Sequence, residues 1–258
     1  MVSKGGFSHI YLSPHLDDAV LSCGGRIWQQ TRAGESVAVV TVFGGVPPTD
    51  RSLSAYAREL HARWRQPAEA VGERRREDRE ALALLGAEAV HWRYRDCIYR
   101  TTPGGEYAYT SEAALWGSIH PSEIDLIQEL LDRIGALSPM GESALYAPLA
   151  VGGHVDHRIV RKAAERWGQA LTCYEDFPYA AEPGMTEAAL SGERWTAELV
   201  CLSSEALEAK IAAIARYGSQ ISTFWGGRAE MAASVRAFAE STGTVAPAER
   251  YWRPRSGP

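Results

Sequence analysis

The fold is decided by one stretch near the start of the chain, His9-Ile10-Tyr11-Leu12-Ser13-Pro14-His15-Leu16-Asp17-Asp18. Its first half is typical of a short buried strand, and a helical pattern over 19–32 follows its second half. A strand that runs directly into a helix is the opening unit of an α/β sheet. Two adjacent aspartates at the strand end repel each other, so we expect a positive charge beside them, and a divalent metal is the natural candidate.

The same order of strand and helix recurs along the chain. Further strands are predicted over 36–43, 87–94, 144–149, 170–174 and 195–202, the last as an added edge strand. Helices are predicted over 52–64, 73–85, 121–137, 156–167, 204–217 and 229–240, with a substrate-side loop over 96–118 and a frayed tail over 253–258. This alternation predicts an α/β fold, a Rossmann-like three-layer sandwich with a mostly parallel sheet and helices on both faces.

Length and composition fit one large domain over residues 1–258. The chain is 45% hydrophobic, which is enough for a substantial core. Its net charge of −5 argues against a nucleic-acid partner, because nucleic-acid-binding surfaces are usually basic. No apolar run approaches the ~20 residues needed to span a bilayer. The first residues lack the apolar core of a signal peptide, so we expect a cytoplasmic protein.

The cysteines predict neither disulfides nor a cysteine-rich zinc site. They are Cys23, Cys97, Cys173 and Cys201, which are widely spaced and contain no CxxC pair. We expect buried, reduced thiols.

A second polar cluster follows another predicted strand, in the run Gly152-Gly153-His154-Val155-Asp156-His157. Because sites in parallel sheets form at the carboxyl ends of strands, we expect this cluster to meet the first one. Each motif alone is also explained as a helix cap or as surface polarity. Together they favour a metal site, in which His15, Asp18 and His157 offer two ring nitrogens and one carboxylate, the set typical of catalytic zinc.

At these residues the chain resembles the PIG-L/LmbE-like family of zinc-dependent de-N-acetylases, which act on molecules containing N-acetylglucosamine. That family pairs an HPDDE-type motif with a later HxDH-type motif, which correspond to residues 14–19 and 154–157. The helix around Arg74 and the aspartate Asp96 after the next strand look like further family features. Gly152 stands where some sugar deacetylases carry a tyrosine that assists the oxyanion. The resemblance covers nearly the whole chain.

The resemblance implies removal of the acetyl group from an N-acetylated amino sugar, a small-molecule substrate, or from its conjugate. The metal would be Zn²⁺, with Fe²⁺ or Co²⁺ also compatible with such ligands. Asp17 would be the general base, and His154, held protonated by Asp156, would support the oxyanion or protonate the leaving amine. Arg74 and Asp96 would bind sugar hydroxyls or a neighbouring phosphate.

The sequence also leaves other functions open. The same site would also serve a thioconjugate amidase or a hydratase, and a sugar-binding relative without activity is a further alternative. A nucleotide-binding Rossmann protein is disfavoured, because no GxGxxG follows the first strand. The sequence leaves undecided the group attached to the sugar, the physiological metal, the role of His154 and the oligomeric state, including a homo-oligomer.

Overall fold

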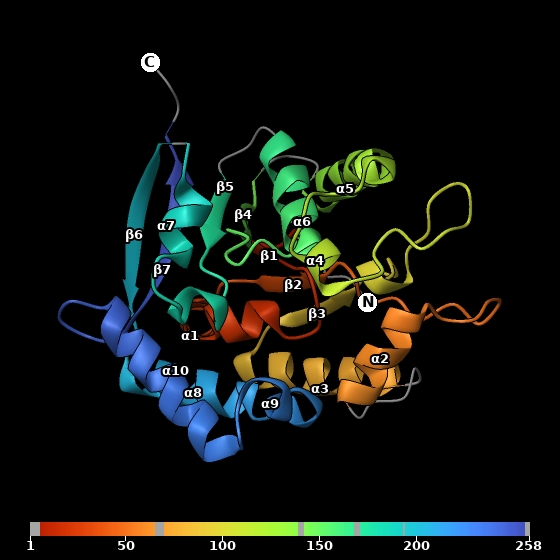
Figure 1. Ribbon diagram of the computed structural model, residues 1–258. Coiled ribbons are helices and arrows are strands. Elements are labelled where there is room, and N and C mark those ends of the chain that lie inside the picture. Colours follow the sequence, from red (N-terminus) through yellow and green to blue (C-terminus); the bar gives the residue numbers. More distant parts are fainter. Residues whose placement is uncertain (1–5, 65–69, 139–141, 168–170, 193, 256–258) are drawn as a thin grey trace.

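The computed structural model describes residues 6–64, 70–138, 142–167, 171–192 and 194–255. In this part of the chain, seven strands form one sheet in the order β3-β2-β1-β4-β5-β7-β6 (Figure 1). The strands are β1 (His9–Ser13), β2 (Val37–Thr41), β3 (Glu88–His91), β4 (Ala144–Pro148), β5 (Leu171–Tyr174), β6 (Trp195–Cys201) and β7 (Ala248–Pro254). The first five are parallel, and β7 runs antiparallel to both β5 and β6, so the sheet is mostly parallel as predicted.

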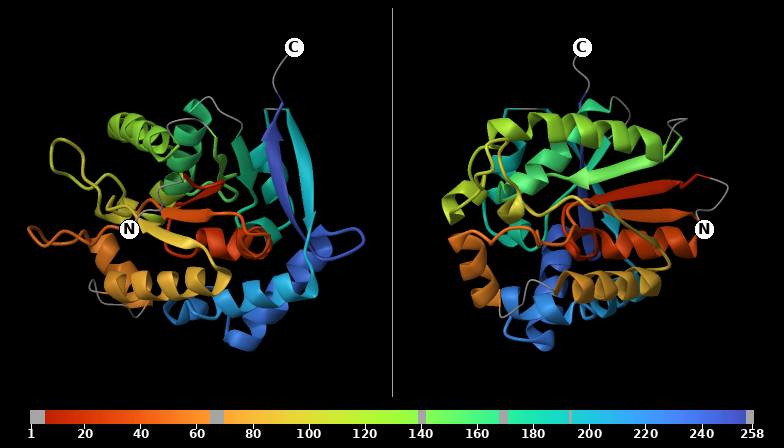
Figure 2. Two further views of the ribbon diagram at one scale, coloured as in Figure 1. Left: turned by 180° about the vertical axis from the view of Figure 1, so that it is seen from behind. Right: turned by 90° about the vertical axis from the view of Figure 1, so that its right-hand side faces the viewer.

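Helices cover both faces of this sheet. Figure 2 shows α5 and α6 in green on one side, and α3 in orange with α8 in blue on the other. Because successive side chains of a strand point to opposite faces, Tyr11 and Val39 pack toward α1, whereas Ile10 and Val40 pack toward α5 and α6. The helices are α1 (Asp18–Arg32), α2 (Ala55–Trp64), α3 (Ala70–Leu85), α4 (Glu112–Leu115), α5 (Ile124–Leu137), α6 (Val155–Arg166), α7 (Met185–Leu190), α8 (Ser204–Ile214), α9 (Gly218–Phe224) and α10 (Arg228–Thr242). The predicted three-layer sandwich is therefore confirmed.

Two glycines let α1 approach α8 closely. A Cβ atom at Gly25 would lie 2.7 Å from the methyl carbons of Leu202, and one at Gly24 would lie 3.0 Å from Cγ of Lys210. The Lys210 ammonium reaches across this contact to Glu249 on β7, 2.8 Å from Oε1. This contact ties α1 to α8 and β7, and α1 is the helix whose first turn carries the aspartates of the opening motif.

The C-terminal segment differs from the prediction. Arg253 and Pro254 belong to β7, which lies inside the sheet between β5 and β6, rather than to a frayed tail. The charged residues of β7 are neutralised there by partners, because Glu249 binds Lys210 and Arg250 binds Glu175 with 2.6 Å between Nε and Oε1. The sequence also did not predict α7, α9 or α4, and α4 lies inside the segment 96–118 that it predicted as a loop. The strand β6 is the edge strand that the sequence predicts.

Other expectations fall partly outside the described residues or need a small correction. Ala170, at the start of one predicted strand, and the ends 1–5 and 256–258 lie outside them. Cys201 is exposed on β6, whereas the other cysteines are buried, and all are free. Within the described ranges, no helix has the length and apolar character that a membrane crossing needs. One domain over 1–258 stays a prediction.

Candidate active site

The turn between β1 and α1 fixes the first three polar residues of the site. The hydroxyl of Ser13 donates to the carbonyl of His15 at 2.7 Å and accepts from the backbone N–H of Ala19 at 3.0 Å. The carboxylate of Asp18 accepts from the backbone N–H of His15 at 2.7 Å. These bonds turn the Asp18 carboxylate back toward the His15 ring and leave Asp17 outside the contact.

The turn between β4 and α6 places the second motif opposite the first. It contains Gly152 at φ 86° and Gly153 at φ 80°, in the left-handed region that glycine tolerates best. The ring of Tyr179 lies against this turn, since a Cβ atom at Gly152 would be 3.3 Å from its Cγ. A tyrosine therefore stands beside this position, contributed by the segment after β5. The α6 helix then begins, and its first turn carries His154 and His157 into the space above β1.

Three donor atoms from the two turns converge. Oδ2 of Asp18 lies 3.3 Å from Nδ1 of His15 and 3.4 Å from Nε2 of His157, and the donor atoms of all three residues lie within 4.8 Å of one another. Zinc bonds of about 2.1 Å to nitrogen and oxygen place tetrahedral donors about 3.4 Å apart. The spacing of these atoms therefore fits a divalent metal ion.

The remaining nitrogen of each histidine ring is held by a buried carboxylate. Nε2 of His15 lies 3.0 Å from Oδ2 of Asp156, and Nδ1 of His157 lies 2.6 Å from Oδ1 of Asp176. Both carboxylates are almost inaccessible to solvent. Such partners fix the tautomer and direct the other nitrogen at a metal. The structure thus brings together His15, Asp18 and His157, whose role as ligands stays a prediction. The sequence did not single out Asp176.

The adjacent aspartates of the opening motif have different surroundings. Asp18 belongs to the donor set, whereas Asp17 lies 3.8 Å from the Arg74 guanidinium. Burial, reinforced by the charge of Asp18, raises the pKa of the Asp17 carboxyl to about 7. Burial alone would also raise the pKa of Asp18, but the neighbouring His157 and His15 hold it well below its usual range. A cation at the donor set would lower the pKa of Asp17 as well.

The expected link between Asp156 and His154 is wrong in its details. The Asp156 carboxylate binds His15, the backbone N–H of Cys97 at 3.1 Å and Arg100 at 2.6 Å. The hydrogen bond from Asp156 to His154 comes from the backbone N–H, which donates to Nδ1 at 3.3 Å. Burial lowers the pKa of His154 to about 4, which favours the neutral ring. The reason is positional, because the Asp156 carboxylate is directed at His15 and Arg100.

Arg100 completes the buried network behind His15. Its guanidinium lies 2.6 Å from Oδ1 of Asp156 and 2.7 Å from Oε2 of Glu123. Burial opposes ionisation of Asp156, but the charges of Arg100 and His15 hold its pKa well below the usual range. No sequence signal marks Arg100, whereas Asp176 could be found as a carboxylate directly after a buried strand.

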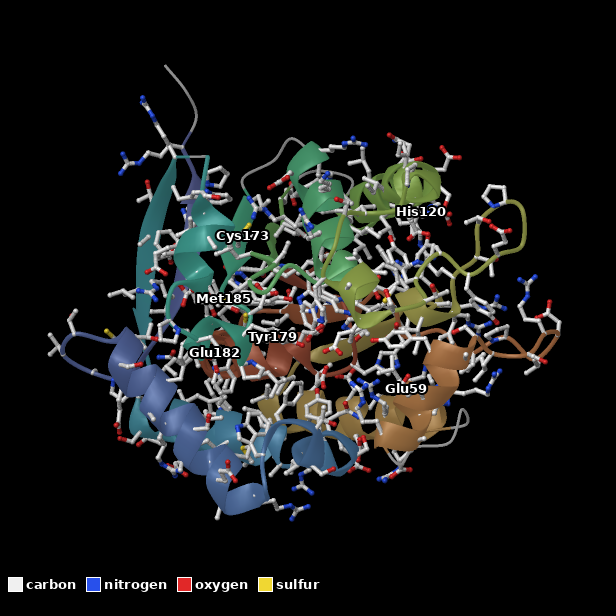
Figure 3. All side chains as sticks on the ribbon, in the orientation of Figure 1. Glu59, His120, Cys173, Tyr179, Glu182 and Met185 are labelled. Atoms are coloured by element: carbon white, nitrogen blue, oxygen red, sulfur yellow. The ribbon has the colours of Figure 1, made fainter. Side chains whose placement is uncertain are left out.

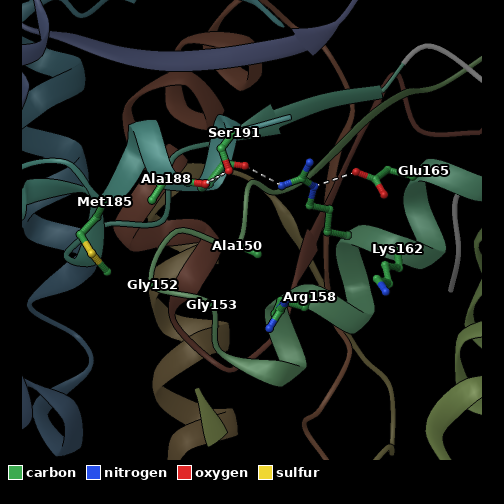
Figure 4. A pocket seen from close by; sticks show the side chains of 11 residues that line it. Ala150, Gly152, Gly153, Arg158, Lys162, Glu165, Met185, Ala188 and Ser191 are labelled. Carbon is green, nitrogen blue, oxygen red and sulfur yellow. Dashed lines mark hydrogen bonds and ion pairs between the residues drawn. The ribbon is translucent and has the colours of Figure 1, made fainter. Parts of the chain in front are cut away.

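The donor set opens into a cleft of about 740 Å³ that also contains Asp17, Arg74, Asp96 and His154. The apolar and aromatic part of its lining comes from Tyr56, Leu60, Leu115, Trp116, Tyr179 and Phe224. Trp116 stands edge-on to His154 and Tyr179, with ring centroids 5.2 and 5.5 Å apart. Tyr179 lies near the centre of the view in Figure 3. A separate hollow of about 430 Å³ between α6 and α7 contains no predicted site residue (Figure 4).

Comparisons with known proteins identify the family. The sequence model of the PIG-L family, described as GlcNAc-PI de-N-acetylase, matches residues 10–167. The chain is 27% identical to 2'-N-acetylparomamine deacetylase of Niallia circulans, over 94% of this chain and 89% of the relative. A protein of the same name from Streptomyces fradiae is 33% identical over 67% of this chain and 58% of its own.

A solved structure has a similar fold. The zinc-inhibited form of the teicoplanin deacetylase Orf2 superposes with a TM-score of 0.84 and 29% identity, covering 96% of this chain and 98% of its own. The two sequence motifs, residues 14–19 and 154–157, both lie inside the region that the family model matches. The chain therefore belongs to the PIG-L family.

Proposed function

We propose that this protein is a metal-dependent hydrolase that removes the acetyl group from an N-acetylated amino sugar carried on a larger molecule. One observation carries the proposal: the donor atoms of His15 and His157 lie 3.3 and 3.4 Å from Oδ2 of Asp18. His15 and Asp18 line a cleft together with Asp17, which is outside this donor set. The relatives named as deacetylases of N-acetylparomamine and teicoplanin support the same reaction class.

Each polar residue has a role that follows from its contacts. A divalent cation held by the three donors, Zn²⁺ in our proposal and Fe²⁺ or Co²⁺ as alternatives, would supply a Lewis acid for the acetamide carbonyl and acidify a water. Asp17 takes the proton of that water as general base, since its carboxylate is not one of the three metal donors and is free to accept a proton. His154 accepts a backbone bond at Nδ1, so its Nε2 is the nitrogen that serves the carbonyl oxygen or the leaving amine. Asp156 positions His15.

The cleft supports a sugar conjugate as substrate rather than a free monosaccharide. Its volume of about 740 Å³ lies in the range of ~300–1,000 Å³ typical of sites for drug-sized ligands. Arg74, Asp96 and Trp116 all line the cleft. Arg74 and Asp96 would hold sugar hydroxyls, and Trp116 would contact the attached group. The proposal also includes a cytoplasmic location and no nucleic-acid partner, with a homo-oligomer compatible with it.

Acetate release tests the proposal. The protein is stripped with a chelator, reloaded with one equivalent of Zn²⁺, Fe²⁺ or Co²⁺, and incubated with 2'-N-acetylparomamine or N-acetylglucosamine. We expect acetate only from metal-loaded protein. A thioconjugate amide and an unsaturated acid serve as comparison substrates for the amidase and hydratase alternatives. Turnover of either one without acetate release from any N-acetylated sugar would overturn the proposal.

A further inference from the structure

The hollow between α6 and α7 is separate from the cleft that contains the donor set. Its volume of about 430 Å³ lies within the range of ~300–1,000 Å³ that is typical of small-molecule sites. Among the described residues, none lines both spaces. Gly152 lines the hollow and packs against Tyr179, which lines the cleft. A molecule in the hollow would therefore be distinct from the substrate of the cleft.

Two positive charges on the wall of the hollow have no carboxylate partner. Arg158 and Lys162 are four residues apart on α6, so their side chains are neighbours on one face of the helix. In the described part of the chain, Arg158 donates to the carbonyl of Gly117 at 2.5 Å, and neither cation pairs with a carboxylate. The lining contains one carboxylate, Glu165, which is bound to Arg161 at 2.7 Å. An anion in the hollow would compensate both free charges.

The wall across from these cations is apolar. Met185, Ala188 and Ala189 line the hollow from α7, and Figure 4 shows Met185 and Ala188 on the side away from Lys162. A methionine side chain is flexible and polarisable, so it adapts to the shape of an apolar group. The two walls together fit a molecule that carries an acid group on a compact apolar body.

The hollow is formed before any ligand binds. Arg161 donates to the carbonyl of Leu149 at 2.9 Å and to that of Ala189 at 3.3 Å, which connects α6 to both of the other walls. Ala150, also in the lining, has φ 60°, a left-handed conformation that persists only where the surrounding structure enforces it. A ligand that enters a wall fixed in this way loses little free energy to ordering.

We propose that this hollow is a second binding site, which takes a small organic acid. Its phosphate or carboxylate group lies within reach of Arg158 and Lys162, and its apolar part packs against Met185. The guanidinium of Arg158 suits such a group, because its planar fork of donors matches the oxygens of either oxyanion. The proposal does not rest on the proposed function, since no residue of the donor set or the cleft lines this hollow.

Methionine methyl groups report on the hollow directly. The chain contains four methionines, of which Met185 lines the hollow and Met231 is buried on α10. The full chain, labelled with ¹³C at the methionine methyl groups and loaded with one equivalent of Zn²⁺, is titrated with phenyl phosphate, and Met185→Leu assigns the signal. We expect a saturable shift of the Met185 methyl signal and an unchanged Met231 signal. Phenol, which lacks the acid group, should bind about tenfold or more weakly. Benzoate tests the carboxylate in the same way.

Substitutions on α6 test the two charges. Lys162 is exposed, so Lys162→Gln leaves the packing intact and should weaken phenyl phosphate binding about two- to fivefold, the range of exposed ion pairs. Arg158→Gln should weaken it about tenfold or more. Arg166→Gln is the matched control, because Arg166 is exposed on the same helix and lies outside the lining, and it should bind like wild type.

Three results would overturn the proposal. The first is a wild type whose Met185 signal does not shift with either acid. The second is wild-type affinity in both Lys162→Gln and Arg158→Gln. The third is a shift that is lost in Arg74→Gln and kept in Arg158→Gln, which would place the acid in the cleft instead. Acetate release enters none of these readouts, so a failure of the proposed function would be seen separately.

Discussion

Asp176 offers a sharp test of how the metal site is held. Its Oδ1 lies 2.6 Å from Nδ1 of His157, and its Oδ2 accepts from the backbone N–H of Val151 at 2.9 Å. The residue is 2% exposed, so no water can replace a lost bond. Asp176→Asn keeps the shape of the side chain but turns one acceptor oxygen into a donor NH₂ group.

The consequence for His157 follows from the hydrogen-bond inventory. Val151 can only donate, so the asparagine oxygen turns to Val151 and its NH₂ group faces Nδ1 of His157. That nitrogen must then accept, which places the ring proton on Nε2, the atom that faces Asp18. Restoring the metal-binding tautomer places the ring N–H opposite the amide NH₂ group, and leaving buried donors unpaired costs about 1–3 kcal/mol. This corresponds to a loss of about 10–100-fold in metal affinity.

The assay is a competition titration of metal-free protein against a chelator. Glu175→Gln is the matched control, because it makes the same chemical change in the preceding buried residue, whose carboxylate binds Arg250 and Trp252 instead. We expect weaker metal binding in Asp176→Asn alone. Wild-type affinity in Asp176→Asn, or an equal loss in the control, would refute the reasoning.

Three further substitutions test other parts of the site. Asp17→Asn should keep bound metal and lower kcat by about 10²–10⁴, since it removes the general base. Metal content and kcat are measured on the same preparation, and a normal kcat would contradict this role. Arg100→Met should lower the free energy of unfolding by about 3–5 kcal/mol in urea, because it leaves the buried carboxylates of Asp156 and Glu123 without their cation; an unchanged midpoint would speak against this. Trp116→Ala should raise KM for an N-acetylated conjugate about 2–12-fold, matching ~0.5–1.5 kcal/mol of aromatic contact, with Trp116→Phe close to wild type; equal KM values would remove Trp116 from the substrate contacts.

Much of the fold and the metal motif follows from local patterns in the sequence. A β-branched run such as 36–43 predicts a buried strand whatever surrounds it, although the structure shortens it to Val37–Thr41. Parallel strands end at the same edge of a sheet, so residues 15–18 and 154–157, which each follow a predicted strand, can be expected to meet before the structure is known. The donor set His15, Asp18 and His157 lies where this rule predicts.

The parts that the sequence did not predict depend on partners far along the chain. Asp156 is two residues from His154, yet its carboxylate binds His15, from the turn between β1 and α1, and Arg100, which directly follows residues 97–99. The strand β7 carries charged residues inside the sheet, which local propensity disfavours, and it is compensated by Lys210 and Glu175. In both cases the deciding term is an ion pair that exists only in the folded chain.

The most direct test of the account is the position of the metal itself. Crystals of protein loaded with one metal equivalent should give one strong anomalous peak at the absorption edge of that metal. We expect the peak about 2.0–2.2 Å from Nδ1 of His15, Oδ2 of Asp18 and Nε2 of His157, with Asp17 outside bonding distance. A peak bonded to Asp17, or a metal bound elsewhere with this donor set empty, would contradict the division of the two aspartates into a ligand and a base.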